Sequence, residues 1–335
     1  MQIGPPRTAP APGVAFDTSL DGDIDQLLGL AMLFGFEGRR LARVPSISTS
    51  RFNLQAARVL DVVARFYGGE QAGDFVVNRL PLPIGMTATG PQTTDQSPML
   101  DAVLMKTTAD GKAVYPRPLT ALNDTADPVA LIRNALSAQA DRNAVVVLAG
   151  PPTNLLAMLA RPDGRDWAHK KPRLLSVAAG RFASGAVDPI ARGDVAGFRK
   201  LLAEWPTPIV MAGTELSDAL PFPGASLESR TAWAPNHPIV DAYRAWRPMP
   251  YDAPSRTLAA VLHAVSPDEP YFDLSPPGTI TLADDGRTTF TSSPGGQHRY
   301  LIAKPDQKER VLQAYVETVT AQPPPRPARG GRPPA

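Results

Sequence analysis

The sequence predicts an α/β fold in which helices cover both faces of an open, mostly parallel sheet. Three observations lead to this prediction. Short apolar runs, of which residues 143–148 (NAVVVL) are the clearest, are typical of strands buried on both faces. These runs alternate with segments whose apolar residues recur at helical spacing. The length of 335 residues suits one large α/β domain with a substantial core.

The first half of the chain opens with a strand, a polar loop and a helix. Val14–Asp17 reads as a buried strand that ends in a carboxylate, and helical spacing follows from Asp25 to Phe34. The same pattern continues with strand Leu41–Ile47, helix Asn53–Tyr67, a possible short strand Phe75–Asn78, helix Pro128–Ala140, strand Asn143–Leu148 and a helix from Asn154 to Leu159.

The second half repeats the alternation and ends in a small C-terminal hairpin. The expected elements are strand Leu174–Ala178, helix Asp194–Glu204, strand Pro208–Ala212, helices Pro238–Trp246 and Thr257–Val265, strands Thr279–Leu282 and Thr288–Thr291, and helix Lys308–Thr320. The Asp-Asp-Gly sequence between the last two strands predicts an antiparallel turn. Ligands of parallel sheets bind at the carboxyl ends of the strands, so we expect a site in the loops after Phe16, Leu148 and Val177.

The two ends of the chain are rich in proline. We expect a disordered lead-in over residues 1–13, one domain over 14–321, and a disordered Pro/Arg/Gly tail over 322–335. The cationic tail is expected to be solvated, and contact with RNA or with an acidic or SH3-like partner is the alternative.

Composition excludes several classes of function. The absence of cysteine excludes disulfides, thiolate chemistry and zinc–sulfur sites. A net charge of +2 argues neither for nor against nucleic acid, and because no folded segment shows a basic run we expect no nucleic-acid partner. No apolar stretch approaches the length of a membrane span, and the N-terminus lacks the apolar core of a secretory signal. We therefore expect a cytoplasmic protein without a membrane partner.

An aspartate-rich loop follows the first predicted strand. Residues 17–25 (DTSLDGDID) contain Asp17, Asp21, Asp23 and Asp25. Carboxylates this close repel one another unless a cation, a basic side chain or a helix N-terminus offsets the charge. The spacing differs from that of an EF-hand. It leaves two interpretations open, a Ca²⁺ or sugar-diol site and a solvated acidic turn that caps the next helix.

The loop and several later segments resemble the inosine–uridine-preferring nucleoside hydrolase family. FDTSLDGDIDQLLGLAML is similar to the family's aspartate signature, and GPPTNLLAML at 150–159 resembles its G-P-L-T-N-L segment. LLSVAAG, ARGDVAGFRKLLAEWPTPIVMAG, NHPIVDAYRAW, SRTLAAVLHAV and the ADDGRTTF hairpin resemble later segments, in the right order over about residues 14–305. The resemblance implies a Rossmann-like fold, a ribonucleoside ligand and a possible homodimer.

The resemblance also implies a calcium site, and this sequence departs from it. In the family one Ca²⁺ holds the ribose hydroxyls and the attacking water. The positions of three of its carboxylate ligands hold Ser19, Gln26 and Thr257, and only Thr153, which supplies a backbone carbonyl, is retained. Ser19 also replaces the carboxylate that deprotonates the water. Because Ca²⁺ affinity depends on anionic ligands, we expect a degenerate site with no bound metal, unless Asp21 or Asp23 rebuilds it.

The implied ribose site is kept in part. Asp25 matches the carboxylate that binds the ribose hydroxyls, Asp17 matches a supporting residue, and Asn154 is retained. The ribose-binding asparagine of the family aligns with Ile190, in the segment Asp188-Pro189-Ile190. Arg256 stands beside the lost late aspartate, where it would either replace the cation by pairing with the aspartates or lie on the surface at a helix start.

One histidine and two alternative functions complete the predictions. His237 could line the pocket mouth or lie in an ordinary loop. We expect a nucleoside hydrolase-like protein whose ribonucleoside or ribose-type pocket, formed by Asp17, Asp25, Thr153, Asn154, Arg256 and His237, is inactive or very weak in hydrolysis. The alternative is an active N-glycosidase with a remodelled or metal-independent site, in which Asp25 or Asp23 is the catalytic base.

Overall fold

The computed structural model describes residues 10–68, 82–89, 97–182 and 187–323. The lead-in and the tail fall mostly outside these residues, and so does the possible strand Phe75–Asn78. The end of the predicted lead-in is ordered, because Gly13 already belongs to the first strand and the carbonyl of Pro12 accepts a hydrogen bond from the backbone of Arg43.

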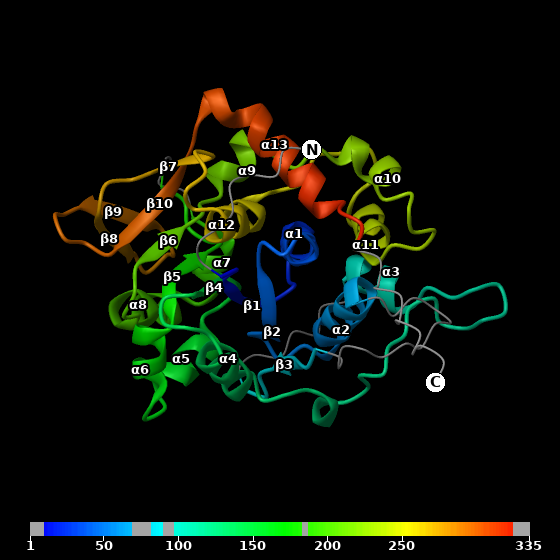
Figure 1. Ribbon diagram of the computed structural model, residues 1–335, viewed down its shortest axis with the longest axis horizontal. Helices are drawn as coiled ribbons and strands as arrows, with labels where there is room; N and C mark the ends of the chain where they lie inside the picture. Colours follow the sequence, from blue (N-terminus) through cyan, green and yellow to red (C-terminus); the bar gives the residue numbers. More distant parts are fainter. Residues whose placement is uncertain (1–9, 69–81, 90–96, 183–186, 324–335) are drawn as a thin grey trace, which may run out of the picture.

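One ten-stranded sheet runs through the molecule (Figure 1). Its strands are β1 (Gly13–Thr18), β2 (Arg43–Thr49), β3 (Ile84–Met86), β4 (Ala144–Ala149), β5 (Pro172–Val177), β6 (Ile209–Met211), β7 (Phe272–Leu274), β8 (Gly278–Leu282), β9 (Thr288–Ser292) and β10 (His298–Ala303). The order is β3-β2-β1-β4-β5-β6-β10-β8-β9, with β7 paired to β10. All pairs from β3 to β10 are parallel, and β8, β9 and β7 add antiparallel pairs at one end.

Helices cover both faces of this sheet, as the alternating pattern predicts (Figure 1). The α-helices are α1 (Asp25–Gly38), α2 (Leu54–Gly68), α3 (Pro98–Leu104), α4 (Pro128–Ser137), α5 (Thr153–Leu159), α6 (Gly164–Lys170), α7 (Pro189–Gly193), α8 (Val195–Glu204), α9 (Glu215–Ala219), α10 (Leu227–Arg230), α11 (Pro238–Trp246), α12 (Arg256–Val265) and α13 (Lys308–Val319). Short 3₁₀ turns lie at Leu122–Asp124, Gly224–Ser226 and Pro305–Gln307.

Strand β4 shows how the sequence divides the core between the two faces. Val145, Val147 and Ala149 belong to one apolar core together with residues of α1, α2, α11, α12 and α13, whereas Val146 and Leu148 belong to a second core with residues of α5, α6 and α8. Successive side chains of a strand point to opposite faces, so an unbroken apolar run is what a strand covered on both sides requires.

The predicted open, mostly parallel sheet with a C-terminal hairpin is confirmed. The hairpin is β8–β9, whose strands pair antiparallel on either side of the Asp-Asp-Gly sequence. Strand β10, which the sequence does not predict, lies between β6 and the hairpin and so joins the hairpin to the main sheet. Among the described residues no helix has the length and apolar character that a membrane crossing would need.

Candidate functional site

The candidate site lies where the order of the parallel strands reverses. In chain order, β2 and β3 lie on one side of β1, and the next strands, β4 and β5, lie on its other side. The loops after β1 and β4 therefore leave the sheet in opposite directions, and the crevice between them is the usual ligand site of such sheets. The aspartate loop follows β1, and the GPPTN segment follows β4.

Asp17, in β1, is hydrogen-bonded to β2 and to α5 beneath this crevice. One of its carboxylate oxygens accepts hydrogen bonds from Ser48 Oγ of β2 at 2.6 Å and from Asn154 Nδ2 of α5 at 2.9 Å. Its other oxygen, Oδ2, is buried and has no hydrogen-bond partner within the described part of the chain. Burial raises the pKa of Asp17 to about 7, although the two hydrogen bonds oppose that rise.

Asp23 and Asp25 lie at the start of α1 and connect it to α12. Asp23 Oδ1 accepts from the backbone N–H of Asp25 at 3.1 Å, and Asp25 Oδ2 accepts from the backbone N–H of Thr257 at 2.8 Å. Asp25 thus places a carboxylate at the N-terminus of α12, where the helix dipole favours negative charge. Burial and then the neighbouring Asp23 raise the pKa of Asp25 to about 6, against the attraction of Arg256. Burial also raises the pKa of Asp23.

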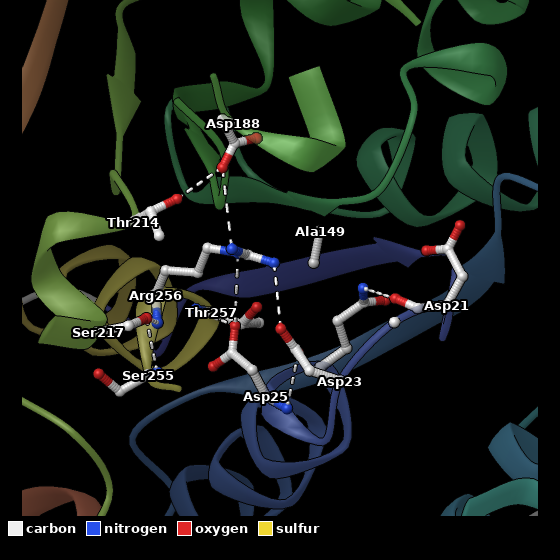
Figure 2. A network of polar contacts seen from close by, with 12 residues as sticks. Asp21, Asp23, Asp25, Ala149, Asp188, Thr214, Ser217, Ser255, Arg256 and Thr257 are labelled. Carbon is white, nitrogen blue, oxygen red and sulfur yellow. Dashed lines mark hydrogen bonds and ion pairs between the residues drawn. The ribbon is translucent and has the colours of Figure 1, made fainter. Parts of the chain in front are cut away.

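Arg256, the first residue of α12, is buried and not on the surface (Figure 2). It lies among Asp23, Asp25 and Asp188, and these four residues are called the carboxylate cluster below. Its guanidinium Nη2 donates to Asp23 Oδ2 at 3.3 Å, and its Nε lies 3.9 Å from Asp25 Oδ2. Its Nη1 lies 3.8 Å from Asp188 Oδ2. Burial by itself would lower the pKa of Arg256, but the attraction of these carboxylates outweighs burial and raises the pKa above its usual value. The side chain is only 8% exposed, so its charge is screened little by water.

Asp188 is a member of the cluster that the sequence reasoning did not identify. Its Oδ1 accepts from the backbone N–H of Ala191 and so caps α7, and its Oδ2 accepts from Thr214 Oγ1 at 2.7 Å and faces Arg256. The signals in the sequence were its place in the segment Asp188-Pro189-Ile190, which aligns with the family's ribose-binding segment, and its position before a proline, which by itself indicates a helix N-cap.

A pocket of ≈ 530 Å³ reaches Asn154, and its described lining includes none of Asp23, Asp25, Asp188 and Arg256. Thr153 and Asn154 at the start of α5 line it, together with residues 86–89 after β3 and residues 125–129 at the start of α4. Asn154 connects the two regions, because the same side chain that lines the pocket donates to Asp17. The volume is within the range of small-molecule pockets.

His237 lies in a different environment. Its ring is surrounded by Phe66, Tyr67 and Trp233, with ring centroids 4.6, 6.0 and 5.2 Å away. Tyr67 in turn stacks on Phe34 of α1. Phe34 comes nine residues after Asp25 in this helix, which separates the two by about 13 Å along the helix axis. Among the described contacts none joins His237 to the carboxylate cluster, and a role for it in ligand binding stays a prediction.

Solved structures with this architecture identify the fold. A plant nucleoside hydrolase, PpNRh1, is 17% identical to this chain, and the match covers 93% of this chain and 100% of that one with a TM-score of 0.62. An inosine–guanosine nucleoside hydrolase is 15% identical over 92% of this chain and 99% of that one, with a TM-score of 0.67.

The chain has the nucleoside hydrolase fold.

Further nucleoside hydrolase-like structures extend this comparison. The inosine–uridine preferring nucleoside hydrolase from Bacillus anthracis is 13% identical, with coverages of 93% and 100% and a TM-score of 0.61. The type III effector XopQ, solved with adenosine diphosphate ribose, is 13% identical, with coverages of 94% and 96% and a TM-score of 0.62. No profile of a known family and no curated protein matches the sequence.

The oxygens at the calcium-ligand positions that the nucleoside hydrolase resemblance implies take part in hydrogen bonds within the aspartate loop. Gln26 Oε1 accepts hydrogen bonds from the backbone N–H groups of Leu20, at 2.6 Å, and Ser19, at 3.2 Å, and its Nε2 donates to the carbonyl of Asp21. The Gln26 amide therefore closes the aspartate loop on itself. A neutral oxygen that already faces two N–H donors is a poor ligand for a hard divalent cation.

The neighbouring carboxylates of the loop are also engaged by other side chains. The Ser19 hydroxyl donates to Asp21, whose other oxygen lies 2.6 Å from Arg51 Nε. Asp23 faces Arg256, so both carboxylates that could rebuild a metal site are paired with arginine. In the described residues no group of three histidine, cysteine or carboxylate side chains is arranged to hold a metal ion. Sequence reasoning had not assigned Arg51 a role, because an arginine two residues after a strand carries no specific signal.

Proposed function

We propose that this chain is a nucleoside hydrolase-like protein that binds a ribose-containing ligand without calcium and hydrolyses it very slowly or not at all. The observation that carries the proposal is the Arg256 guanidinium, which lies among Asp23, Asp25 and Asp188 in the crevice at the carboxyl end of the sheet. A fixed organic cation there supplies the positive charge that the family takes from a metal.

The cluster has the polar groups that a sugar diol needs. Each ribose hydroxyl both donates and accepts a hydrogen bond. Asp25 Oδ1 is a buried acceptor and Arg256 Nε a buried donor, and neither has a hydrogen-bond partner among the described residues. A ligand hydroxyl would satisfy such atoms, which otherwise cost about 1–3 kcal/mol each when left unpaired. The pocket lined by Thr153 and Asn154 offers room for the rest of a nucleoside.

The same geometry argues against efficient hydrolysis. The residue at the position of the water-activating carboxylate is Ser19, and its hydroxyl is engaged with Asp21. A serine hydroxyl is a very weak base near neutral pH, and loss of a general base costs about 10²–10⁴ in rate. Asp21, which could act through Ser19, is held by Arg51 at 2.6 Å.

One observation favours the alternative, a metal-independent N-glycosidase. Burial raises the pKa of Asp25 to about 6, close to the range in which a carboxylate accepts a proton near neutral pH. In this version Asp25, or Asp23, would activate the water, and Arg256 would orient the sugar hydroxyls.

Two assays on the wild-type protein, each with and without EDTA, separate these functions. Calorimetry with ribose, inosine, uridine and adenosine diphosphate ribose should detect binding that EDTA leaves unchanged, and a reducing-sugar assay should detect no ribose release. Asp25→Asn should weaken binding by about tenfold or more, whereas Asp284→Asn, at an exposed turn, should not. Ribose release that EDTA abolishes would overturn the proposal, and EDTA-resistant release would favour the alternative.

A further inference from the structure

The tip of the aspartate loop is hydrogen-bonded to a tryptophan from a distant part of the chain. The carbonyl of Gly22 accepts from the indole Nε1–H of Trp246 at 3.3 Å. Trp246 is the last residue of α11, a helix that contacts α1. The bond therefore joins the loop after β1 to a residue 224 positions later in the chain.

The backbone of the loop has the left-handed conformation at two residues. Leu20 has a φ of +50° and Gly22 a φ of +100°. This conformation is costly for leucine, whereas glycine adopts it readily. A Cβ added at Gly22 would meet no atom within 4 Å, so its backbone conformation and not lack of space favours glycine there. A bond from outside the loop thus stabilises a turn that contains one unfavourable residue.

Two neighbouring carbonyls at the tip are held by different side chains. Gln26 Nε2 donates to the carbonyl of Asp21 at 3.1 Å from within the loop, and the indole holds the next carbonyl from α11. Asp23 follows directly, and its carboxylate accepts from Arg256 Nη2 at 3.3 Å. Because the peptide after Gly22 leads straight into Asp23, its orientation affects where that carboxylate lies.

The indole of Trp246 is supported by its own neighbours. The Arg247 guanidinium carbon lies 4.1 Å from the centroid of the indole ring, and the Tyr251 ring lies 5.5 Å away at 56°. Tyr251 is fixed in turn by Tyr243, because the two rings stack at 4.3 Å and each hydroxyl donates to the backbone carbonyl of the other residue. These contacts direct the indole N–H at the loop.

The tip is the most exposed part of the aspartate loop. Gly22 is exposed, and the side chains of Asp21 and Asp23 are 28% and 17% exposed. Asp17 and Asp25, at the two ends of the loop, are buried. Segments with few buried contacts open first, so a movement of the loop would begin at the tip, where the indole bond opposes it.

We infer that Trp246 is a positioning residue of the proposed sugar site, which acts by holding the tip of the aspartate loop. Through the carbonyl of Gly22 it keeps Asp23 beside Arg256, and so keeps the carboxylate cluster in the arrangement that receives the ribose hydroxyls. The inference rests on the proposed function for its ligand, but its main test measures the loop itself and needs no ligand.

Hydrogen exchange followed by mass spectrometry, on wild type and Trp246→Phe, provides this test. Phenylalanine keeps an aromatic ring in the same place and removes the N–H donor. The peptide over residues 17–27 contains the amides of Ser19 and Leu20, which are hydrogen-bonded within the loop. We expect these amides to exchange about threefold to tenfold faster in Trp246→Phe, as the loss of one hydrogen bond predicts. Exchange in the core strand β4 should stay unchanged.

Trp233→Phe is the matched control. The indole of Trp233 also donates to a backbone carbonyl, that of Thr320 at 3.2 Å, but at the end of α13. This variant should exchange as wild type does over residues 17–27. Unchanged exchange of the loop in Trp246→Phe would overturn the inference. An equal increase in β4 would also overturn it, because Trp246 would then stabilise the whole fold and not the loop.

Gly22→Ala supplies a test that keeps Trp246 in place. A Cβ at this residue opposes the φ of +100° and should turn the carbonyl away from the indole. In protein labelled with ¹⁵N-tryptophan, the change should move one of the four indole N–H signals, and the loop should exchange faster than in wild type. If all four indole signals stay in place, the carbonyl is not held by an indole and the inference fails.

Sugar binding gives the last readout. Calorimetry with ribose should show about threefold to tenfold weaker binding by Trp246→Phe than by wild type. Equal affinities, together with a loosened loop, would overturn the positioning role. Absence of ribose binding by wild type would instead count against the proposed function, and the exchange measurement would still decide whether the indole holds the loop.

Discussion

Replacing Asp17 by asparagine should change how the stability of the protein depends on pH. Burial raises the pKa of this carboxyl from 3.8 to about 7. The folded state therefore keeps a proton that the unfolded chain releases between about pH 4 and pH 7. Stability falls with rising pH wherever the folded state binds more protons, so Asp17 lowers the free energy of unfolding as pH rises through this interval.

The size of the effect follows from the shift. A difference of about 3 pKa units at about 1.36 kcal/mol each corresponds to about 4 kcal/mol lost between pH 4 and pH 8. Asparagine at this position keeps an oxygen that can accept from Ser48 and Asn154, but it leaves a buried amide group without a partner, at a cost of about 1–3 kcal/mol. Asp17→Asn should therefore gain stability relative to wild type as pH rises from 5 to 8, and at pH 8 it should be as stable as wild type or more stable.

Urea denaturation of both proteins at pH 5, 6, 7 and 8 measures this difference. Subtracting the two profiles removes the contributions of all other titrating groups, including those of Asp25 and His237. The exposed Asp284→Asn variant should run parallel to wild type at every pH. Parallel profiles for wild type and Asp17→Asn would refute the argument that Asp17 holds a proton in the folded state.

Three further predictions concern packing, a buried histidine and calcium. Gly29→Ala should destabilise the protein by about 1–3 kcal/mol in urea denaturation, because its Cβ would come 2.4 Å from Thr257 Cγ2; an unchanged midpoint would contradict this. Burial lowers the pKa of His237 to about 4, so wild type should lose about 3 kcal/mol between pH 6.5 and pH 4 that His237→Phe retains, and equal losses would contradict this. The triple change Ser19→Asp, Gln26→Asp and Thr257→Asp should raise Ca²⁺ affinity by about tenfold or more in calorimetry, and no gain would contradict the predicted ligand positions.

The parallel part of the sheet could be predicted because its signals are local. In β4 every residue is buried, and an apolar run such as AVVVL records that burial directly in the sequence. Strand β10 (HRYLIA) was missed because it is only partly buried and has no comparable run. Its place between β6 and β8 depends on pairing with strands far away in the sequence, which local patterns do not report.

The candidate site could be predicted only in part, for a similar reason. The aspartate loop and the G-P-P-T-N segment are continuous motifs, so Asp17, Asp25 and Asn154 could be assigned to the site from their order in the chain. Asp188 carries no such motif, because an aspartate before proline is usual at any helix start. It belongs to the site only because Thr214 and Arg256 come to it from elements much later in the chain.

The sequence by itself determined the α/β class, the resemblance to nucleoside hydrolases, and the neutral residues Ser19, Gln26 and Thr257 at positions where that resemblance implies carboxylates. These properties depend on residue type and on local spacing, which the chain carries whether or not it is folded. Only the tertiary structure decided that Arg256 points inward and that Asp23, Asp25 and Asp188 surround it. The physical reason is that the electrostatic energy of buried charges depends on distances of a few ångströms between side chains up to 233 positions apart, and folding alone sets those distances.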